Sequence, residues 1–382
     1  MTRRPQSALS LLAGAVLTLQ AGALPAADSP EAINDVLRTL RVEEAPAPVR
    51  ERKDWRRPKK IVLLAFNGRT ASQRDELAGA VPGVDVVAAK NLPEAVSLAR
   101  DADVLIGFNP EICSREVIDG ARQLRWIQSL AAGVENCMAI RSVHDRNLLM
   151  TNMRGVDSAA IAEHAIALAL ALAHGLDTYA SDTSRAVWSG QHAAITPMRV
   201  LAGKTLLVVG LGGIGTEVAS KAHGLGMNVV ATRASGEGKP DFVSHVGAPG
   251  DLLELARSAD VIVSAVPLTA QTTGMYDAKF FAVVKPTALF INVARGASVV
   301  TADLAAALAS GRLAGAGLDV VDPEPLPPDN PLWRAPHLIV SPHISGRSDL
   351  PGDARWVIAR ENLRRYVAGG RMLSVVDIAR GY

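Results

Sequence analysis

The sequence has few cysteines, few aromatic residues and almost no net charge. Its 382 residues include two cysteines, and aromatic residues make up 4%. Two cysteines are too few for a disulfide scaffold or for the ligands of a structural zinc site. Lys and Arg number 40 against 38 Asp and Glu, a net charge of +2, which argues against a large nucleic-acid-binding surface. We therefore predict no nucleic-acid partner and no metal site.

Apolar residues, by contrast, are plentiful and make up 48% of the chain. A chain of this length and apolar content can fill the cores of about two domains, which excludes disorder for most of it. The composition favours a soluble α/β protein that acts on a small molecule.

Residues 1–27 have the three parts of a secretory signal peptide. Arg3 and Arg4 come first, an apolar stretch runs from Ala8 to Leu19, and small residues follow. The apolar stretch is shorter than the roughly 20 residues of a spanning helix, so we predict no membrane span. This interpretation predicts a periplasmic or exported protein. The alternative is a cytoplasmic enzyme whose start site is mis-assigned.

The remaining chain alternates apolar strands with helices. Residues 28–59 are interpreted as a linker. The pattern from Pro30 to Arg41 predicts a short amphipathic helix, and the stretch after it is broken by prolines and dense in charge, which indicates a solvated connector. From Lys60 onward, short β-branched runs alternate with helical segments, a pattern typical of parallel sheets covered on both faces. A second run of strands begins at Lys204 and predicts a doubly wound sheet. The residues after Gly346 are too few for a domain, and we expect them to return to the first sheet.

A glycine-rich turn carries the strongest local signal. Gly210, Gly212 and Gly215 form a GxGxxG pattern that directly follows the strand TLLVVG and opens a helix. The first glycine allows the tight turn, the second lets the backbone approach a pyrophosphate, and the third lets the helix pack on the strand. We predict a dinucleotide site whose cradle includes Gly213 and Ile214.

The next strand ends without the acid that NAD sites use. That acid usually follows the first glycine by about 20 residues, and here Thr232 and Arg233 occupy the position. Arg233 can pair with a 2′-phosphate through a charge-assisted fork, and Thr232 adds a donor. The pattern therefore favours NADP over NAD. The alternative is that Arg233 is a surface residue that does not discriminate between the two.

Three polar residues follow three successive apolar strands. Arg295 comes after LFINVA, Glu324 just beyond GLDVV, and His343 after LIVSP. Because the carboxyl ends of parallel strands meet at one crevice, these side chains should converge. An arginine can bind a carboxylate and polarise a carbonyl, a histidine can donate a proton near neutral pH, and a glutamate can stabilise the imidazolium. Together they fit the reduction of a 2-oxo acid.

Several stretches together resemble the D-isomer-specific 2-hydroxyacid dehydrogenase family, in particular its glyoxylate/hydroxypyruvate reductase and phosphoglycerate dehydrogenase-like members. They are LRWIQSLAAGVE, GKTLLVVGLGGIG, PLTAQTTG, INVARGASVV, GAGLDVVDPEPLPPDNPLW and SPHISG. The resemblance covers nearly all of residues 60–382 and implies an NAD(P)-dependent oxidoreductase. It implies that His343 is the acid/base, that Glu324 is its partner and that Arg295 binds the substrate.

The same resemblance implies further contacts with substrate and cofactor. Backbone amides around Ala132, Gly133 and Val134 would hold the substrate carboxylate, and Asp319 would contact the nicotinamide amide. Two short segments would line the nicotinamide and its ribose, namely Val266 with Pro267 and Val293 with Ala294. The family often carries Arg where this chain has Gly213, so that pyrophosphate contact is absent here.

The resemblance also implies two doubly wound α/β domains. A Rossmann nucleotide domain, residues 166–345, would be inserted in a discontinuous flavodoxin-like substrate domain made of residues 60–165 and 346–382. Substrate would bind in the cleft between them. The family further implies a homodimer.

Two other functions fit the same fold. One is formate or phosphite oxidation. Glu324 argues against formate, because formate dehydrogenases that resemble this pattern carry Gln as the histidine partner, whereas phosphite stays open. The other is a non-catalytic nucleotide-sensing module.

Four other residues have simple structural interpretations. Cys113 and Cys137 are interpreted as two small buried residues and not as a disulfide. His164 and His174 lie at the ends of an apolar helical stretch and are interpreted as packing or hydrogen-bonding histidines.

Overall fold

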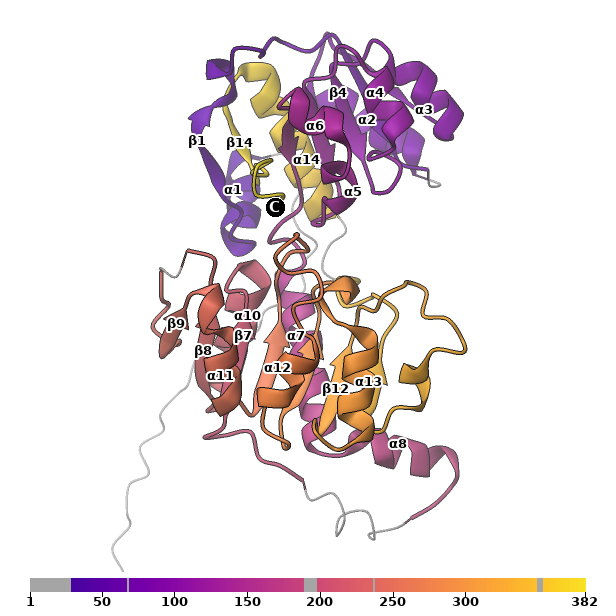
Figure 1. Ribbon diagram of the computed structural model, residues 1–382. Helices are drawn as coiled ribbons and strands as arrows, with labels where there is room; N and C mark the ends of the chain where they lie inside the picture. Colours follow the sequence, from indigo (N-terminus) through magenta and orange to yellow (C-terminus); the bar gives the residue numbers. More distant parts are fainter. Residues whose placement is uncertain (1–28, 67–68, 189–197, 236–237, 349–352) are drawn as a thin grey trace, which may run out of the picture.

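The computed structural model describes residues 29–66, 69–188, 198–235, 238–348 and 353–382. These residues form two lobes, each built on one parallel sheet with helices around it (Figure 1). The predicted signal peptide, residues 1–27, lies outside the described residues.

The first lobe is built on a five-stranded parallel sheet with the order β3-β2-β4-β5-β6. This is the order 2-1-3-4-5 of flavodoxin-like sheets. In β2, alternate residues enter two different cores: Ile61 and Leu63 pack on one face, and Val62 and Leu64 on the other. A strand buried on both faces is what a covered parallel sheet requires. The strands are β2 (Lys60–Leu64), β3 (Asp85–Ala88), β4 (Val104–Gly107), β5 (Trp126–Ser129) and β6 (Leu149–Thr151).

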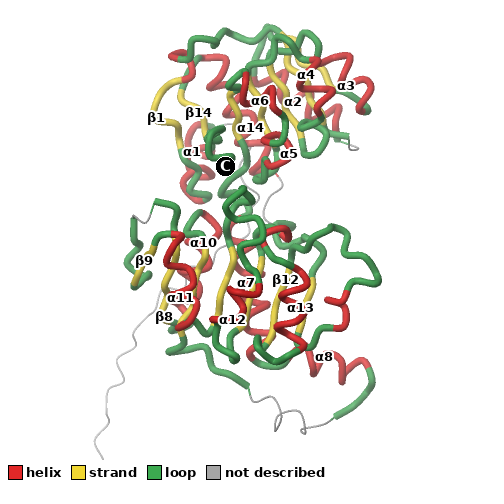
Figure 2. The backbone as a smooth tube through the Cα atoms, viewed as in Figure 1, coloured by secondary structure: helices red, strands yellow, loops and turns green. Residues whose placement is uncertain are grey.

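Helices cover both faces of this first sheet (Figure 2). Most come from the segment between β2 and β6, and one comes from the chain end. They are α2 (Thr70–Ala80), α3 (Leu92–Ala99), α4 (Arg115–Gly120), α5 (Glu135–Met138), α6 (Arg141–Asp145) and α14 (Asp353–Ala368).

The second lobe is built on a seven-stranded parallel sheet with the order β13-β12-β11-β10-β7-β8-β9. Read from β9, this contains the 3-2-1-4-5-6 order of a Rossmann sheet. The strands are β7 (Thr205–Val209), β8 (Asn228–Thr232), β9 (His245–Gly247), β10 (Val261–Ser264), β11 (Leu289–Asn292), β12 (Gly315–Leu318) and β13 (Leu338–Val340). The predicted fold class, two doubly wound parallel sheets with the Rossmann sheet inserted in the chain of the first, is therefore confirmed.

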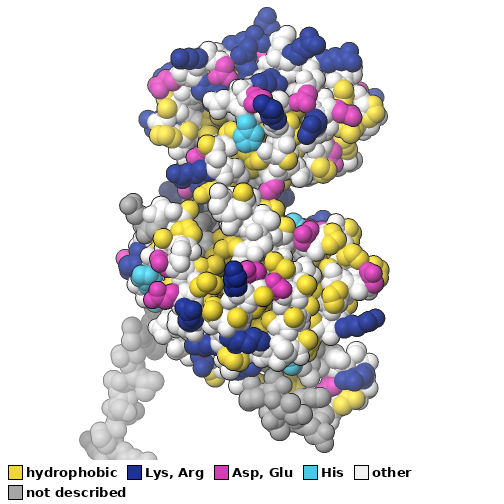
Figure 3. Space-filling model, in the orientation of Figure 1, with side chains coloured by type: hydrophobic (Ala, Val, Ile, Leu, Met, Phe, Trp, Pro, Cys, Tyr) yellow, Lys and Arg dark blue, Asp and Glu magenta, His cyan; other side chains and the backbone are white. Residues whose placement is uncertain are grey.

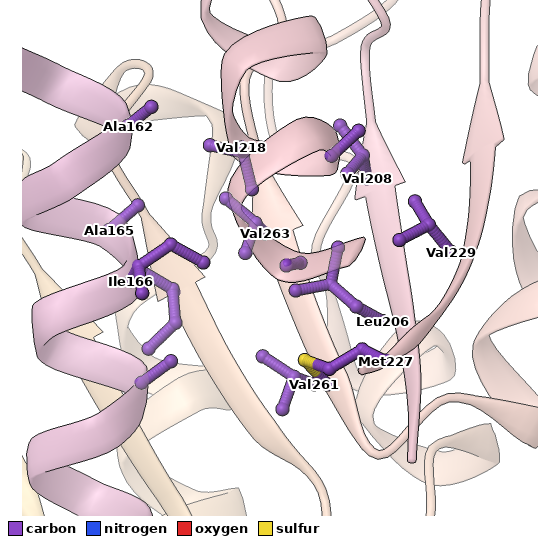
Figure 4. Packing of buried hydrophobic residues seen from close by; sticks show 14 of the residues in the cluster. Ala162, Ala165, Ile166, Leu206, Val208, Val218, Met227, Val229, Val261 and Val263 are labelled. Carbon is purple, nitrogen blue, oxygen red and sulfur yellow. The ribbon is translucent and has the colours of Figure 1, made fainter. Parts of the chain in front are cut away.

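In the described part of the chain, helices of 6 to 16 residues belong to the second lobe. They are α7 (Ser158–Ala173), α8 (Leu176–Ser184), α10 (Gly213–Gly224), α11 (Leu252–Ser258), α12 (Ala278–Val283) and α13 (Thr301–Ala309). Figure 4 shows the core in which Ala162, Ala165 and Ile166 of α7 face Val261 and Val263 of β10. Helix α7 thus belongs to this core from its first turns, and the predicted boundary between residues 165 and 166 falls inside it. The residue boundaries of the domains stay a prediction.

The end of the chain returns to the first lobe. Tyr366 of α14 stacks on Trp126 of β5 with ring centroids 4.8 Å apart. Both rings belong to the core on one face of the first sheet. After α14, strand β14 (Arg371–Leu373) closes this lobe.

The helix predicted from Pro30 to Arg41 is confirmed by α1 (Pro30–Thr39), but the charge-dense stretch after it is not the solvated linker that its prolines and charges suggested. This stretch forms β1 (Glu44–Pro48) and the short helix η1 (Val49–Glu51). Strand β1 pairs antiparallel with β14, and the Trp55 indole donates to the Tyr366 carbonyl at 3.0 Å. The prolines are tolerated because β1 is an edge strand. Apolar side chains along residues 29–59 pack against the core of the first lobe, namely those of Leu37, Leu40, Val42, Val49 and Trp55.

The two cysteines form a disulfide, which contradicts the sequence-based prediction. Cys113 lies in the loop after β4, and Cys137 lies in α5, after β5. Because β4 and β5 are adjacent parallel strands, the segments that follow them lie side by side at one sheet edge. A sheet-and-helix domain of this size favours free buried cysteines, but the adjacency of β4 and β5 brings these two together.

Within the described part of the chain, no single helix is long and apolar enough to cross a membrane. Helices α7 and α8, which are bent by 76° relative to each other, meet the length and composition criteria only as a pair. Acidic and basic side chains are mixed over both lobes on the face drawn in Figure 3.

Candidate active site

The carboxyl ends of strands from both lobes meet between the lobes. Gly133 and Glu135 follow β5 of the first sheet, and Arg295 follows β11 of the second. Arg295 Nε lies 2.9 Å from Glu135 Oε1. A Cβ atom on Gly133 would come within 1.9 Å of Arg295 Nη2. The guanidinium therefore rests directly on the backbone at Gly133, as the prediction of a shared site requires.

Residues 131–134, named the substrate loop below, follow β5, and the Ala131 amide donates to Ser129 Oγ at 3.1 Å. Two asparagine side chains donate hydrogen bonds to the carbonyls of Ala132 and Gly133. Asn152 Nδ2 donates to the Ala132 carbonyl at 2.7 Å, and Asn109 Nδ2 donates to the Gly133 carbonyl at 2.7 Å. Among the described residues, the amides of 132–134 donate no hydrogen bond. Unpaired amides beside a guanidinium form a site for an anion such as a carboxylate.

Arg295 is positioned by a buried asparagine at the end of β11. Asn292 accepts from the Ala294 amide at 3.1 Å and donates to the Arg295 carbonyl at 3.0 Å. The Ser298 hydroxyl also donates to that carbonyl, at 2.7 Å. These bonds fix the turn that directs the arginine. Asn292, Asn109 and Asn152 could not be recognised from the sequence, because an asparagine near a strand end carries no motif of its own.

His343 and Glu324 form the predicted pair. His343 Nδ1 lies 2.7 Å from Glu324 Oε2, and Glu324 Oε1 accepts from the Val321 amide at 3.1 Å. In the described part of the structure, His343 Nε2 has no hydrogen-bond partner, and the side chain is 49% exposed. A carboxylate at Nδ1 fixes the ring and leaves Nε2 available for a substrate.

The backbone of His343 is in an unusual conformation. Its φ angle is +52°, a region that costs a non-glycine residue about 1–2 kcal/mol. The His343 amide donates to the Asp319 carbonyl at 2.8 Å. The neighbouring contacts of this loop, rather than local preference, therefore hold the histidine in place.

Asp319 supplies those contacts. Its carboxylate accepts from the Ser341 hydroxyl at 2.7 Å, the Ile344 amide at 3.0 Å and the Ser345 amide at 3.0 Å, and its side chain is 0% exposed. Asp319 thus shapes the loop that carries His343. Its contact with the nicotinamide amide stays a prediction.

The charge of Asp319 is stabilised in this setting. Burial on its own would raise the pKa of Asp319, but hydrogen bonds from Ser345, Ser341 and the Ile344 amide outweigh it and hold the pKa below the ordinary value. The carboxylate is therefore ionised at neutral pH. His164 joins this network, because its Nε2 lies 2.8 Å from Ser341 Oγ, which confirms its interpretation as a hydrogen-bonding histidine.

The glycine turn has the geometry that a pyrophosphate cradle needs. Gly210 has a φ angle of +97°, and a Cβ there would lie 2.8 Å from the Ala265 carbonyl oxygen. A Cβ on Gly215 would lie 2.0 Å from the Gly210 oxygen, whereas around Gly212 there is open space. Helix α10 begins at Gly213 without a side-chain cap. Its free N-terminal amides fit a phosphate group, so these residues fit a dinucleotide.

Gly213 and Ile214 have packing roles beside the cradle. A Cβ on Gly213 would come 2.9 Å from Ser158 Oγ, so glycine lets the first turn of α7 approach α10 closely. Ile214 is partly buried against the core of the second lobe. Where family members often have an arginine side chain, Gly213 of this chain instead lets α10 pack closely against α7.

The structure places Thr232 and Arg233 next to the glycine turn. The Thr232 carbonyl accepts from the amides of Gly210 and Leu211 at 3.1 and 3.0 Å, and Thr232 is buried. Arg233 lies at the end of β8, where its Nη1 donates to the Gly238 carbonyl at 3.0 Å. Thr232 therefore supports the turn through its backbone, and Arg233 adds a positive charge beside it.

The residues predicted to line the nicotinamide lie at the carboxyl ends of two adjacent strands. Val266 and Pro267 follow β10, and Val293 and Ala294 follow β11. The Thr272 hydroxyl donates to the Pro267 carbonyl at 2.6 Å and fixes the first of these turns. Their contacts with a cofactor stay a prediction.

Comparison with known proteins places the sequence among 2-hydroxyacid dehydrogenases. Residues 166–345 match the model of the NAD-binding domain of D-isomer-specific 2-hydroxyacid dehydrogenases. The glyoxylate reductase of Thermococcus gammatolerans is 35% identical over 262 residues, which are 67% of this chain and 77% of that protein.

Solved structures give the same result. A D-isomer-specific 2-hydroxyacid dehydrogenase family protein from Aeromonas salmonicida is 31% identical, with a TM-score of 0.71 over 84% of this chain and 99% of that one. A D-isomer-specific 2-hydroxyacid dehydrogenase from Xanthobacter autotrophicus, solved with NADPH and MES, is 26% identical, with a TM-score of 0.69 over 84% and 100% of the two chains.

Proposed function

The chain belongs to the D-isomer-specific 2-hydroxyacid dehydrogenase family and is an NAD(P)-dependent oxidoreductase. We propose that it uses NADPH to reduce a small 2-oxo acid, of the glyoxylate or hydroxypyruvate kind, to the D-2-hydroxy acid. The observation that carries this proposal is the contact between Arg295 and the substrate loop. It places a guanidinium and free amides together, where a small carboxylate would be bound.

The side chains divide the reaction between them. The substrate-loop amides and Arg295 bind the carboxylate, and the guanidinium also polarises the 2-oxo group. When bound, the reduced nicotinamide supplies the hydride. His343 donates a proton from Nε2 to the developing alkoxide oxygen, and Glu324 stabilises the imidazolium through Nδ1. Closure of the two lobes would exclude water from this site.

A steady-state assay tests the proposal. The purified protein should oxidise NADPH in the presence of glyoxylate or hydroxypyruvate, followed by the loss of nicotinamide absorbance across a panel of 2-oxo acids. Tight NADPH binding without turnover would favour a nucleotide-sensing module. Phosphite-dependent reduction of NADP⁺, with no reaction of any 2-oxo acid, would favour the phosphite alternative.

The preference for NADP over NAD is a further part of the proposal. Arg233, next to the glycine turn, supports it. We expect Arg233→Asp to raise the KM for NADPH by about 30-fold or more, because a charge-assisted pair with the 2′-phosphate is worth about 2–3 kcal/mol, and to change the KM for NADH far less. Arg257→Asp is the matched control, because Arg257 is exposed on α11. Equal losses for both cofactors would show that Arg233 does not read the phosphate.

We also propose that the protein is a homodimer. Several large apolar side chains are exposed at the start of α8, just after α8 and before β7, which supports a protein interface. They are Leu176, Val187, Trp188, Met198 and Val200. Sedimentation equilibrium should give twice the monomer mass, and a monomer at micromolar concentration would contradict this proposal.

The cellular location remains part of the proposal as well. We propose an exported protein, and the Cys113–Cys137 disulfide supports it, because disulfides persist in oxidising compartments. N-terminal sequencing of the native protein should find a start near residue 24 to 28. An intact Met1 in a cytoplasmic fraction would favour the mis-assigned start site instead.

A further inference from the structure

The Cys113–Cys137 disulfide joins the two segments that shape the carboxylate site. Cys137 lies in α5, which begins at Glu135, directly after the substrate loop. Cys113 lies in the turn after β4, four residues beyond Asn109. Asn109 is the residue whose Nδ2 holds the Gly133 carbonyl at 2.7 Å. The covalent bond therefore ties the turn that carries Asn109 to the helix that follows the loop.

The substrate loop is held mainly through its carbonyls. The amides of 132–134 donate no hydrogen bond among the described residues, and only the Ala131 amide does, to Ser129 Oγ at 3.1 Å. Hydrogen bonds from Met153, Asn152 and Asn109 reach the carbonyls of residues 131, 132 and 133. Helix α5 has only four residues and adds little rigidity of its own. The disulfide is the covalent restraint in this region.

The sulfur of Cys113 also contacts the side chain that positions the loop. Cys113 Sγ lies 2.9 Å from Asn109 Oδ1. A bridged sulfur carries no hydrogen and cannot donate, so this contact is packing and not a hydrogen bond. Cys113 Sγ thus touches Oδ1 of the Asn109 carboxamide, whose Nδ2 donates to the Gly133 carbonyl. Reduction separates the two sulfurs and so changes the support of Asn109 and of α5 together.

We propose that Cys113–Cys137 is a redox modification site that keeps the substrate loop in its anion-binding shape, and that reduction by a dithiol weakens 2-oxo acid binding. The proposal rests on the proposed function for its substrate. Cys113 is 7% exposed and Cys137 0%, so a dithiol thiolate attacks Cys113 Sγ. The S–S bond breaks, Cys137 leaves as a thiolate, and Cys113 forms a mixed disulfide with the reagent. The second thiolate of the reagent then attacks the reagent's own sulfur in that bond and releases Cys113. Two electrons and two protons end on the two cysteine thiols, and the reagent becomes a disulfide.

Kinetics before and after reduction test the proposal. The protein is treated with dithiothreitol under native conditions, and the thiols formed are counted by alkylation and mass spectrometry. We expect the KM for glyoxylate to rise about tenfold, because a small misplacement of binding groups has effects of this size. The kcat and the Kd for NADPH should change by less than about twofold, because the nucleotide site lies in the other lobe. Reoxidation should restore the original KM.

A double variant and an exchange measurement complete the test. Cys113→Ser/Cys137→Ser should show the raised KM without any reductant and should not respond to dithiothreitol. If this variant fails to fold, the reduction of the wild-type protein still decides. An unchanged KM for glyoxylate after both thiols are labelled, or two free thiols in the untreated protein, would overturn the proposal.

Hydrogen exchange separates this proposal from the proposed function. The amides of residues 131–138 should exchange faster in the reduced protein than in the oxidised one, whether or not a 2-oxo acid is turned over. If neither form reduces any 2-oxo acid but exchange differs, the proposed function fails and the role of the disulfide stands. Equal exchange in both forms would overturn the role of the disulfide.

Discussion

Replacing His343 with Ala should lower kcat for 2-oxo acid reduction by about 10²–10⁴-fold, which is the usual contribution of a general acid. The reason is the position of Nε2, which is exposed and has no hydrogen-bond partner among the described residues, while Nδ1 is bound to Glu324 at 2.7 Å. No other group in this pair can deliver a proton to the substrate. NADPH affinity should change by less than about twofold, because the glycine turn lies after a different strand.

The backbone of His343 requires a second variant. Its φ of +52° is tolerated better by asparagine than by most other residues, so His343→Asn separates loss of the acid from loss of the loop conformation. His343→Asn should lose as much kcat as His343→Ala while keeping a melting temperature closer to that of the wild type. A His343→Asn enzyme with kcat within about tenfold of the wild type would contradict the assignment of the acid.

Glu324 should matter less than its partner. Glu324→Gln keeps a hydrogen-bond acceptor for His343 and removes only the charge that stabilises the imidazolium. We therefore expect a loss in kcat clearly smaller than that of His343→Ala. Comparing the two variants tests whether His343 transfers the proton and whether Glu324 orients and stabilises the His343 imidazolium.

Much of this site could be predicted from the sequence, because its principal residues follow strands. Gly210, Arg295 and His343 come directly after apolar runs, and the parallel order of the sheet brings such positions to one edge. Strand patterns and glycine spacing involve residues close together in the sequence, so they can be recognised without knowing which distant residues are in contact. The fold class and the His343–Glu324 pair were predicted on this basis.

The parts that could not be predicted depend on contacts between distant segments. Asn109 and Asn152 act on carbonyls 24 and 20 residues away, and a single asparagine gives no sign of such a partner. Residues 29–59 join the first lobe through contacts with distant segments, which include the pairing of β1 with β14 near the chain end and the bond from Trp55 to Tyr366. The disulfide depends in the same way on the adjacency of β4 and β5.

Asp319 illustrates a different limit. The resemblance to the family implies a contact with the nicotinamide amide, which stays a prediction. The structure shows contacts that the motif does not indicate, because the carboxylate accepts from Ser341 and from the amides of Ile344 and Ser345. The Asp319 carbonyl also accepts from the His343 amide, so Asp319 supports the loop that carries His343.

The second large effect is expected from Arg295. Arg295→Ala should lower kcat/KM for the 2-oxo acid by about 10³-fold, because it removes a charge-assisted fork that is worth several kcal/mol in a desolvated site. Arg295→Lys should recover only part of this loss, since an ammonium lacks the planar pair of donors. Binding of NADPH, measured by fluorescence titration, should remain within about twofold of the wild type in both variants.

Gly133→Ala tests whether the position of Arg295 matters as well as its charge. The added Cβ would lie 1.9 Å from Arg295 Nη2, and the end of an arginine side chain can move, so the fold should survive while the guanidinium is displaced. We expect kcat/KM for the 2-oxo acid to fall by about tenfold or more, with a melting temperature within a few degrees of the wild type. Wild-type kcat/KM in Gly133→Ala would show that the contact between the guanidinium and the substrate loop is not needed. Wild-type KM in Arg295→Ala would remove the basis for placing the substrate carboxylate there, because the loop amides would then be sufficient to bind it.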